Sequence, residues 1–162
     1  MDLMQLVYTI SFLAVVIAFA YAVYLHFWVK RQPAENQKIL EVSGLIHAGA
    51  NTFMRKEYLI LARFAGVAAV LILVFLPAPI WNGNIADNLS MVIAYLAGTV
   101  LSAIAGKMGI VVATQANSRA AEGAQKGLKP AFLIGFRGGA VMGLAVVGFC
   151  LLGVMAVLWF IP

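Results

Sequence analysis

Acidic and histidine side chains are the first residues to consider for chemistry in this 162-residue chain, because carboxylates bind hard metal ions and imidazoles bind metals or carry protons. The six acidic residues are Asp2, Glu35, Glu41, Glu57, Asp87 and Glu122. Metal-assisted hydrolysis needs several carboxylates in one place, as oxygen ligands and as a general base. These six are spread over the whole chain. The sequence therefore predicts no catalytic residue, no cofactor-binding residue and no metal ligand in this chain.

Other reactive residue types give no stronger signal. His26 and His47 have no second ligand at the spacing of a metal site, so we interpret both as interfacial or packing residues. Cys150 is the only cysteine and supports neither a disulfide framework nor a metal cluster. The chain also lacks a glycine-rich phosphate loop ending in Lys-Ser or Lys-Thr, which argues against a nucleotide site.

Four long apolar runs dominate the chain. Apolar residues make up 64% of it, charged residues only 10%, and the mean hydropathy is +0.98, which is far from the composition of a soluble domain. Runs of about 18 or more apolar residues predict transmembrane helices, because a helix satisfies every backbone polar group inside lipid. The expected spans are residues 3–29, 59–76, 89–112 and 131–161. We therefore predict an all-α, polytopic membrane protein with four transmembrane helices, whose residues 1–162 form a single helical region.

The basic residues predict the orientation of these spans. All eleven lie in two connecting segments or in the nearby ends of the spans. They are Lys30, Arg31, Lys38, Arg55, Lys56, Arg63, Lys107, Arg119, Lys126, Lys129 and Arg137. By the positive-inside rule, both connecting segments face the cytoplasm and both termini face outward. The net charge of +5 then reflects the orientation of the spans. We expect the lipid bilayer as a partner and no nucleic acid. The expected location is a prokaryotic cytoplasmic membrane.

Three basic residues lie inside the expected spans or close to their ends. Arg63, Lys107 and Arg137 are near enough to the interface to snorkel, or they pair with a helix outside this chain. No expected span contains an internal Asp or Glu. A proton-conducting subunit of the rotary-ATPase kind needs such a carboxylate, which argues against that function.

The first connecting segment has a helical period. Apolar residues recur there three or four positions apart, at Ile39, Val42, Ile46 and Phe53. This spacing predicts an amphipathic helix over residues 34–58. We expect it to continue into the second span as one long helix. A helix lying on the membrane surface is the alternative.

Small residues form two rows at four-residue steps in the third and fourth spans. The first row is Gly98, Ser102 and Gly106, extended by Gly109, and the second row is Gly135, Gly139 and Gly143. Such rows let helix backbones approach closely in lipid. We predict that the rows are packing faces, docked against each other as a tight hairpin or against further helices. Chance composition is the alternative.

Three ordered motifs resemble the membrane-bound, ion-translocating inorganic pyrophosphatases. They are "IHAGANTFMRKEY" from Ile46, "GKMGIVVATQANSRAA" from Gly106 and "GFRGGAVMGL" from Gly135. The residues that match the family pattern include Glu57, Tyr58, Thr114, Asn117 and Arg119. The departures are Thr52, Met54, Ile110 and Ala120.

The resemblance implies a pump that couples pyrophosphate hydrolysis to movement of H+ or Na+, with Mg2+ as cofactor. It also implies that the catalytic carboxylates belong to later helices. The chain then looks like the N-terminal, non-catalytic four-span portion of the pump. Its partners would be the remaining pump helices, in a homodimer of the whole. A small independent scaffold or assembly subunit is the alternative, and a reading frame that continues into Asp-rich helices would favour the pump.

Overall fold

The chain forms four long helices. The computed structural model describes residues 3–81 and 83–160. The helices are α1 (Leu3–Lys30), α2 (Gln37–Phe75), α3 (Ile85–Gln125) and α4 (Leu128–Phe160). Each is long and apolar enough to cross a membrane, and the described residues contain no strand. The prediction of an all-α membrane protein with four transmembrane helices is confirmed.

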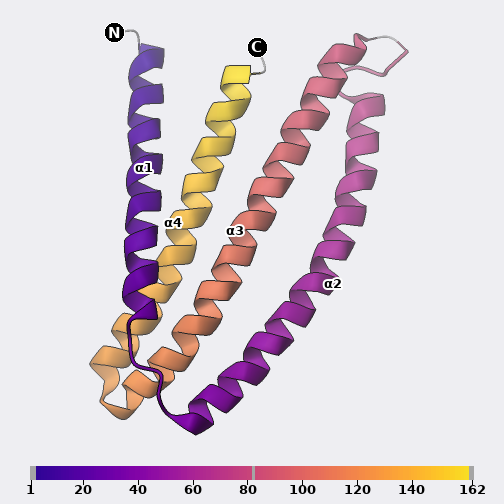
Figure 1. The fold of residues 1–162 in the computed structure, drawn as a ribbon. Coiled ribbons are helices and arrows are strands. Elements are labelled where there is room, and N and C mark those ends of the chain that lie inside the picture. The colour runs from indigo at the N-terminus through magenta and orange to yellow at the C-terminus, as the bar shows by residue number, and fades with distance from the viewer. Residues whose placement is uncertain (1–2, 82, 161–162) are drawn as a thin grey trace.

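The helices run alternately up and down between two ends of the molecule. The start of α1, the end of α4 and the α2–α3 loop lie at one end, which we call the terminal end (Figure 1). The α1–α2 linker and the α3–α4 turn lie at the other, which we call the linker end (Figure 1). Arg31 and Lys126 lie in these two connections, and Lys30 and Lys129 lie in the helix ends next to them. That the linker end faces the cytoplasm stays a prediction from the positive-inside rule.

Two of the helices are much longer than a bilayer requires. α2 has 39 residues and α3 has 41, so each is roughly 60 Å long at 1.5 Å per residue, about twice the thickness of a hydrocarbon core. α2 is continuous, so the segment expected as an amphipathic helix and the second span form one helix. Asn36 caps its start, accepting the backbone N–H groups of Lys38 at 3.1 Å and Ile39 at 3.3 Å.

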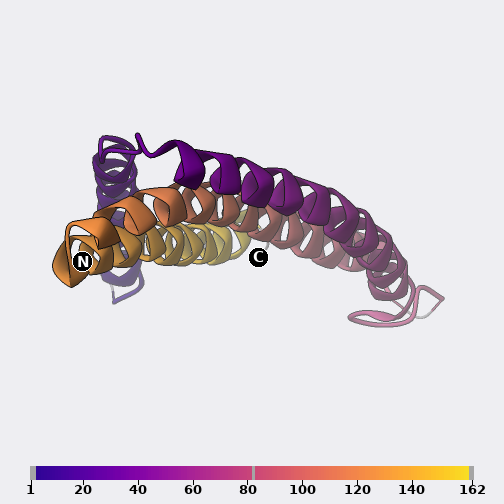
Figure 2. The ribbon, with the colours of Figure 1, turned by 90° about the horizontal axis from the view of Figure 1, so that it is seen from below.

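The helices pack as an open row and not as a closed bundle. α4 lies between α1 and α3, and α2 packs against α3 alone among the described helices. The view from the linker end shows this row edge-on (Figure 2). A buried cluster joins Ala22 and Leu25 of α1 to Val112 of α3 and Val141 of α4. Because a row has two open faces, most large apolar side chains stay exposed for contact with lipid or with other helices.

Two of the three connections are fixed by residues in them or next to them. Gly127, between α3 and α4, has φ +131°, a conformation that side chains rarely adopt, so this short turn requires glycine. At the terminal end, the side chain of Asn88 is only 1% exposed. Its amide donates to the carbonyls of Leu73 at 2.8 Å and Ala78 at 2.9 Å. Asn88 thereby ties the end of α2 and the following loop to α3.

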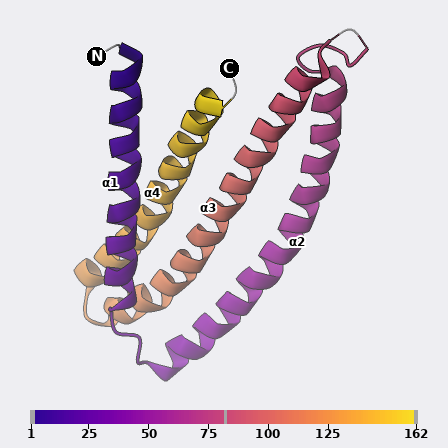
Figure 3. The ribbon, with the colours of Figure 1, turned by 45° about the horizontal axis from the view of Figure 1, so that its top comes forward.

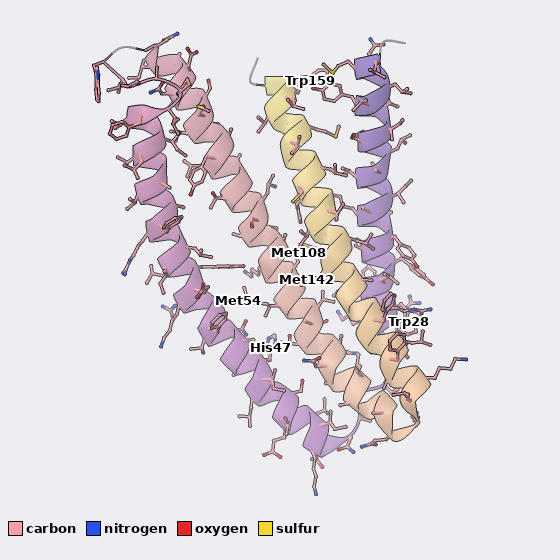
Figure 4. The ribbon with its side chains drawn as sticks, turned by 180° about the vertical axis from the view of Figure 1, so that it is seen from behind. Trp28, His47, Met54, Met108, Met142 and Trp159 are labelled. Carbon is pink, nitrogen blue, oxygen red and sulfur yellow. The ribbon has the colours of Figure 1, made fainter. Side chains whose placement is uncertain are left out.

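Close approach of α3 and α4 depends on glycines outside the second predicted row. A Cβ atom on Gly138 would collide with the Cβ of Ala116. A Cβ on Gly109 would lie 2.7 Å from Cγ of Met142, and Figure 4 shows Met142 where α4 crosses α3. Gly109, which extends the first predicted row, is therefore a true contact.

The two predicted rows do not dock against each other. Within the described part of the chain, a Cβ on Gly98, Gly135, Gly139 or Gly143 would meet no atom within 4 Å. The hairpin uses a different face of α4, because Gly138 is one residue, or about 100°, around the helix from Gly139. Docking of the rows against further helices stays a prediction.

Candidate functional site

The family-motif residues gather along the faces of α2 and α3, toward the linker end. We call the contacts of Arg119 and Glu122 with the α1–α2 linker the α3 clamp. The linker-end part of α3 reaches this position because the helix extends well past its apolar segment. Arg119 and Glu122 lie beyond the expected third span, residues 89–112, where polar groups are less costly than inside lipid.

Glu122 holds the start of α2. Its carboxylate is 8% exposed, and Oε2 accepts the backbone N–H groups of Glu35 at 2.6 Å and Asn36 at 3.4 Å. A buried carboxylate needs such donors to offset its lost hydration. It also lies beside the N-terminus of α2, where the helix dipole favours negative charge.

Arg119 holds the end of α1 from the same helix. Its Nη2 donates to the carbonyl of Lys30 at 3.3 Å, and its Nη1 donates to the carbonyl of Gln115 at 3.0 Å. Lys30 is the last residue of α1, where backbone carbonyls lack helical partners and the dipole favours a cation. One turn of α3 thus places a cation at the end of α1 and an anion at the start of α2.

His47 and Thr114 link α2 to α3 further along. The distance between His47 Nδ1 and Thr114 Oγ1 is 3.3 Å. Thr114 is buried, and its hydroxyl also lies 2.9 Å from the carbonyl oxygen of Ile110. Since a hydroxyl has one proton, a Thr114 that donates to Ile110 can only accept a hydrogen bond from His47, in the tautomer that carries its hydrogen on Nδ1. Figure 4 shows His47 on α2, where it is exposed and contacts α3 through Thr114.

Tyr58 makes a further contact between α2 and α3. Its hydroxyl donates to the carbonyl of Ala103 at 2.7 Å. A Cβ on Gly106 would lie 3.4 Å from this hydroxyl oxygen. Gly106 was predicted as part of a packing row, and its neighbour is a side chain of α2. Glu57, the preceding motif residue, is half-buried.

Tyr58→Phe is expected to loosen α2 from α3. The change removes one interhelical hydrogen bond and keeps the ring, so it should lower the free energy of unfolding by about 0.5–1.5 kcal/mol. Thermal unfolding in detergent measures the effect. Tyr24→Phe is the control, because the Tyr24 side chain is 58% exposed. Equal stability of the two variants would show that the bond contributes nothing.

One of the three basic residues expected near the interface, Arg137, has a partner inside the chain. The guanidinium carbon of Arg137 lies 3.9 Å from the centre of the Trp28 ring, a cation–π contact that joins α4 to α1. For Arg137, pairing with a helix outside this chain is therefore not needed. Lys107 and Arg63 are exposed on α3 and α2, as snorkelling side chains are expected to be.

Glu122 is the residue that the sequence analysis missed. Its partners are backbone N–H groups 86 and 87 positions earlier, so no local spacing reveals them. Asn117, by contrast, was singled out and is exposed. It lines a groove of about 300 Å³ between α2 and α3, together with Ile39, Val42 and Ile46.

The site does not fit a Mg2+ ion. Among residues 3–81 and 83–160, no three His, Cys, Asp or Glu side chains lie close enough to hold a metal. Glu122, the buried carboxylate, already uses one oxygen for the backbone of the linker. The arrangement can hold the end of α1, the start of α2 and the last turns of α3 in fixed positions relative to one another.

Comparisons with known proteins point to one family. The chain matches the family model described as "Inorganic H+ pyrophosphatase" over residues 16–162. It is 37% identical over 131 residues to a K(+)-stimulated pyrophosphate-energized sodium pump of Thermotoga maritima, covering 80% of this chain and 16% of that protein. It is 33% identical over 141 residues to a K(+)-insensitive pyrophosphate-energized proton pump of Methanosarcina mazei, covering 87% of this chain and 20% of that protein.

A plant protein matches as well. The chain is 30% identical over 151 residues to the pyrophosphate-energized membrane proton pump 3 of Arabidopsis thaliana, covering 88% of this chain and 19% of that protein. The chain thus spans at most a fifth of the length of these three relatives.

Proposed function

The chain belongs to the inorganic H+ pyrophosphatase family, and we propose that it is the N-terminal, non-catalytic helical portion of a membrane pyrophosphatase that couples pyrophosphate hydrolysis to H+ or Na+ pumping. It is a multi-pass membrane protein by its four apolar helices and by this family membership. Its role in the pump is to position helices, and the reaction itself belongs to residues outside this chain.

One observation carries the proposal. Three of the family-motif residues, Tyr58, Thr114 and Arg119, make contacts between helices of this chain. Residues that act on pyrophosphate would instead converge with carboxylates that bind Mg2+. We therefore propose that the Mg2+ and the pyrophosphate bind to later helices, and that this chain stabilises the framework on which those helices stand.

The nature of the pumped ion depends on residues elsewhere. Relatives named as sodium pumps and relatives named as proton pumps match this chain at similar identity. The described spans also have no Asp or Glu in their interior that could carry an ion. We propose that ion choice and any requirement for K+ are set by the remaining helices.

Hydrolysis assays test the proposal directly. The 162-residue chain alone should release no phosphate from Mg2+-pyrophosphate, because residues 3–81 and 83–160 contain no cluster of carboxylates to bind the metal. The complete polypeptide that contains this chain should hydrolyse pyrophosphate and acidify, or load with Na+, the interior of inverted membrane vesicles. Turnover by the isolated chain would contradict a non-catalytic role. A complete polypeptide that ends near Pro162 would favour a scaffold subunit instead.

The proposed orientation places the linker end in the cytoplasm. In a Cys150→Ala background, Gln37→Cys and Gln125→Cys should react with an impermeant maleimide from the cytoplasmic side only. Asp87→Cys, at the terminal end, should react from the outer side only. Reaction from the opposite side at any of the three positions would overturn the orientation. The resemblance also implies a homodimer of the complete pump, which its mass in detergent would test.

A further inference from the structure

An open groove runs between α3 and α4 in the half of the molecule toward the terminal end. Figure 3 shows the two helices close together at the linker end and separating toward their other ends. The groove has a volume of about 640 Å³. Its walls include Gly98, Ser102 and Ala105 of α3, and Val146, Cys150 and Gly153 of α4. At its floor, Leu101 spans the space between the helices, and a Cβ on Gly153 would lie 3.1 Å from its Cδ1.

The shape of the groove matches a helix and not a small polar ligand. Its lining extends from Ala94 to Gly106 along α3, which is roughly 18 Å at 1.5 Å per residue and more than half the thickness of a hydrocarbon core. No Asp, Glu, Lys, Arg or His lines it. The α3 wall carries the first predicted row, where small residues allow a neighbouring backbone to come close.

The groove is also unfilled by the chain itself. In the part of the chain that the structure describes, a Cβ on Gly98 would meet no atom within 4 Å. All the residues that line the groove belong to α3 and α4, and none belongs to α1 or α2. An apolar concavity of this length inside a bilayer is filled either by lipid or by another helix.

We propose that this groove is the docking site of a transmembrane helix from the remaining part of the pump polypeptide, which inserts branched or aromatic side chains between α3 and α4. The inference rests on the proposed function. The relatives named above are at least five times as long as the portion that this chain matches, so a complete pump has many further helices to cover the open row. A second copy of this chain and a lipid acyl chain are the other occupants that the test distinguishes.

Photo-crosslinking in the complete pump tests the proposal. Val146 and Val147 are consecutive residues of one type at the same membrane depth, and they are 37% and 54% exposed. Of the two, only Val146 lines the groove. A diazirine analogue of leucine replaces each in turn, the sample is irradiated in native membranes, and mass spectrometry identifies the adducts. We expect position 146 to crosslink to a helix beyond residue 162 of the same polypeptide, in severalfold higher yield than position 147.

Three crosslinking results would overturn the inference. Adducts at position 146 with residues 1–162 of another copy would assign the groove to a dimer contact. Adducts with lipid alone, or equal yields at both positions, would leave no docked helix. Pyrophosphate hydrolysis is measured on the same samples. If the samples are active but show no crosslink, helix docking in the groove is wrong and the proposed pump function stands. If the crosslink forms but the wild-type polypeptide is inactive, the proposed pump function is wrong and helix docking stands.

Discussion

Gly138→Ala is expected to destabilise the α3–α4 pair, although alanine is the better helix former. The added methyl group would collide with the Cβ of Ala116 on α3. Neither atom is the end of a flexible side chain, so the two backbones must move apart. Overpacking of this kind costs about 1–3 kcal/mol. In lipid, no burial of apolar surface compensates, because the helix association itself depends on close packing.

Gly139→Ala is the matched control one residue away. A methyl group there meets no atom of the described chain within 4 Å, so the isolated chain should gain about 0.5–1 kcal/mol from replacing a helical glycine. The two changes are expected to shift the unfolding temperature in detergent in opposite directions. Ala116→Gly should restore stability to the Gly138→Ala variant. Shifts of equal size and sign would mean that α3 and α4 do not meet at Gly138.

Glu122→Ala is expected to release the α1–α2 linker from α3. It removes the acceptor of two backbone N–H groups, and hydrogen bonds to a charged group contribute about 1.5–3 kcal/mol each. Hydrogen exchange at the amides of Glu35 and Asn36 should accelerate strongly, and the unfolding temperature should fall.

Two further variants separate the role of Glu122 from a general effect of removing charge. Glu122→Gln keeps an acceptor oxygen and should lose less protection at the same two amides. Glu41→Ala removes an exposed carboxylate of α2 and should leave both amides protected. Unchanged exchange in Glu122→Ala would show that the linker is held by other contacts.

The α3 clamp joins α3 to the ends of two other helices of this chain. Arg119 and Glu122 lie within one turn of α3 and hold opposite ends of the same linker. Because the clamp acts on helix ends, displacement of α3 along its axis would be transmitted to both α1 and α2. This coupling is a consequence of the proposed framework role, and it needs no reaction within this chain.

The sequence alone was sufficient to predict the four spans and to identify the family. Hydropathy is a local property, and each apolar run is long enough by itself to require a helix in lipid. The motif that contains Thr114 and Arg119 is likewise contiguous. The Asn36 cap of α2 is also local, because its partners are the backbone N–H groups of Lys38 and Ile39. Such features need no knowledge of which helix lies beside which.

Only the tertiary structure decided which faces meet. Gly139 and Gly138 are equivalent by composition, and the four-residue step favoured Gly139, but the rotation of α4 about its axis brings Gly138 against Ala116. That rotation is set jointly by α1 and α3, because α4 must satisfy both neighbours at once. The contact of Glu122 with the α1–α2 linker could not be predicted for the same reason. Its partners are backbone groups of a distant segment, and backbone groups have no sequence signature. Helix formation is therefore encoded locally in this chain, whereas the choice of contact faces depends on all four helices together.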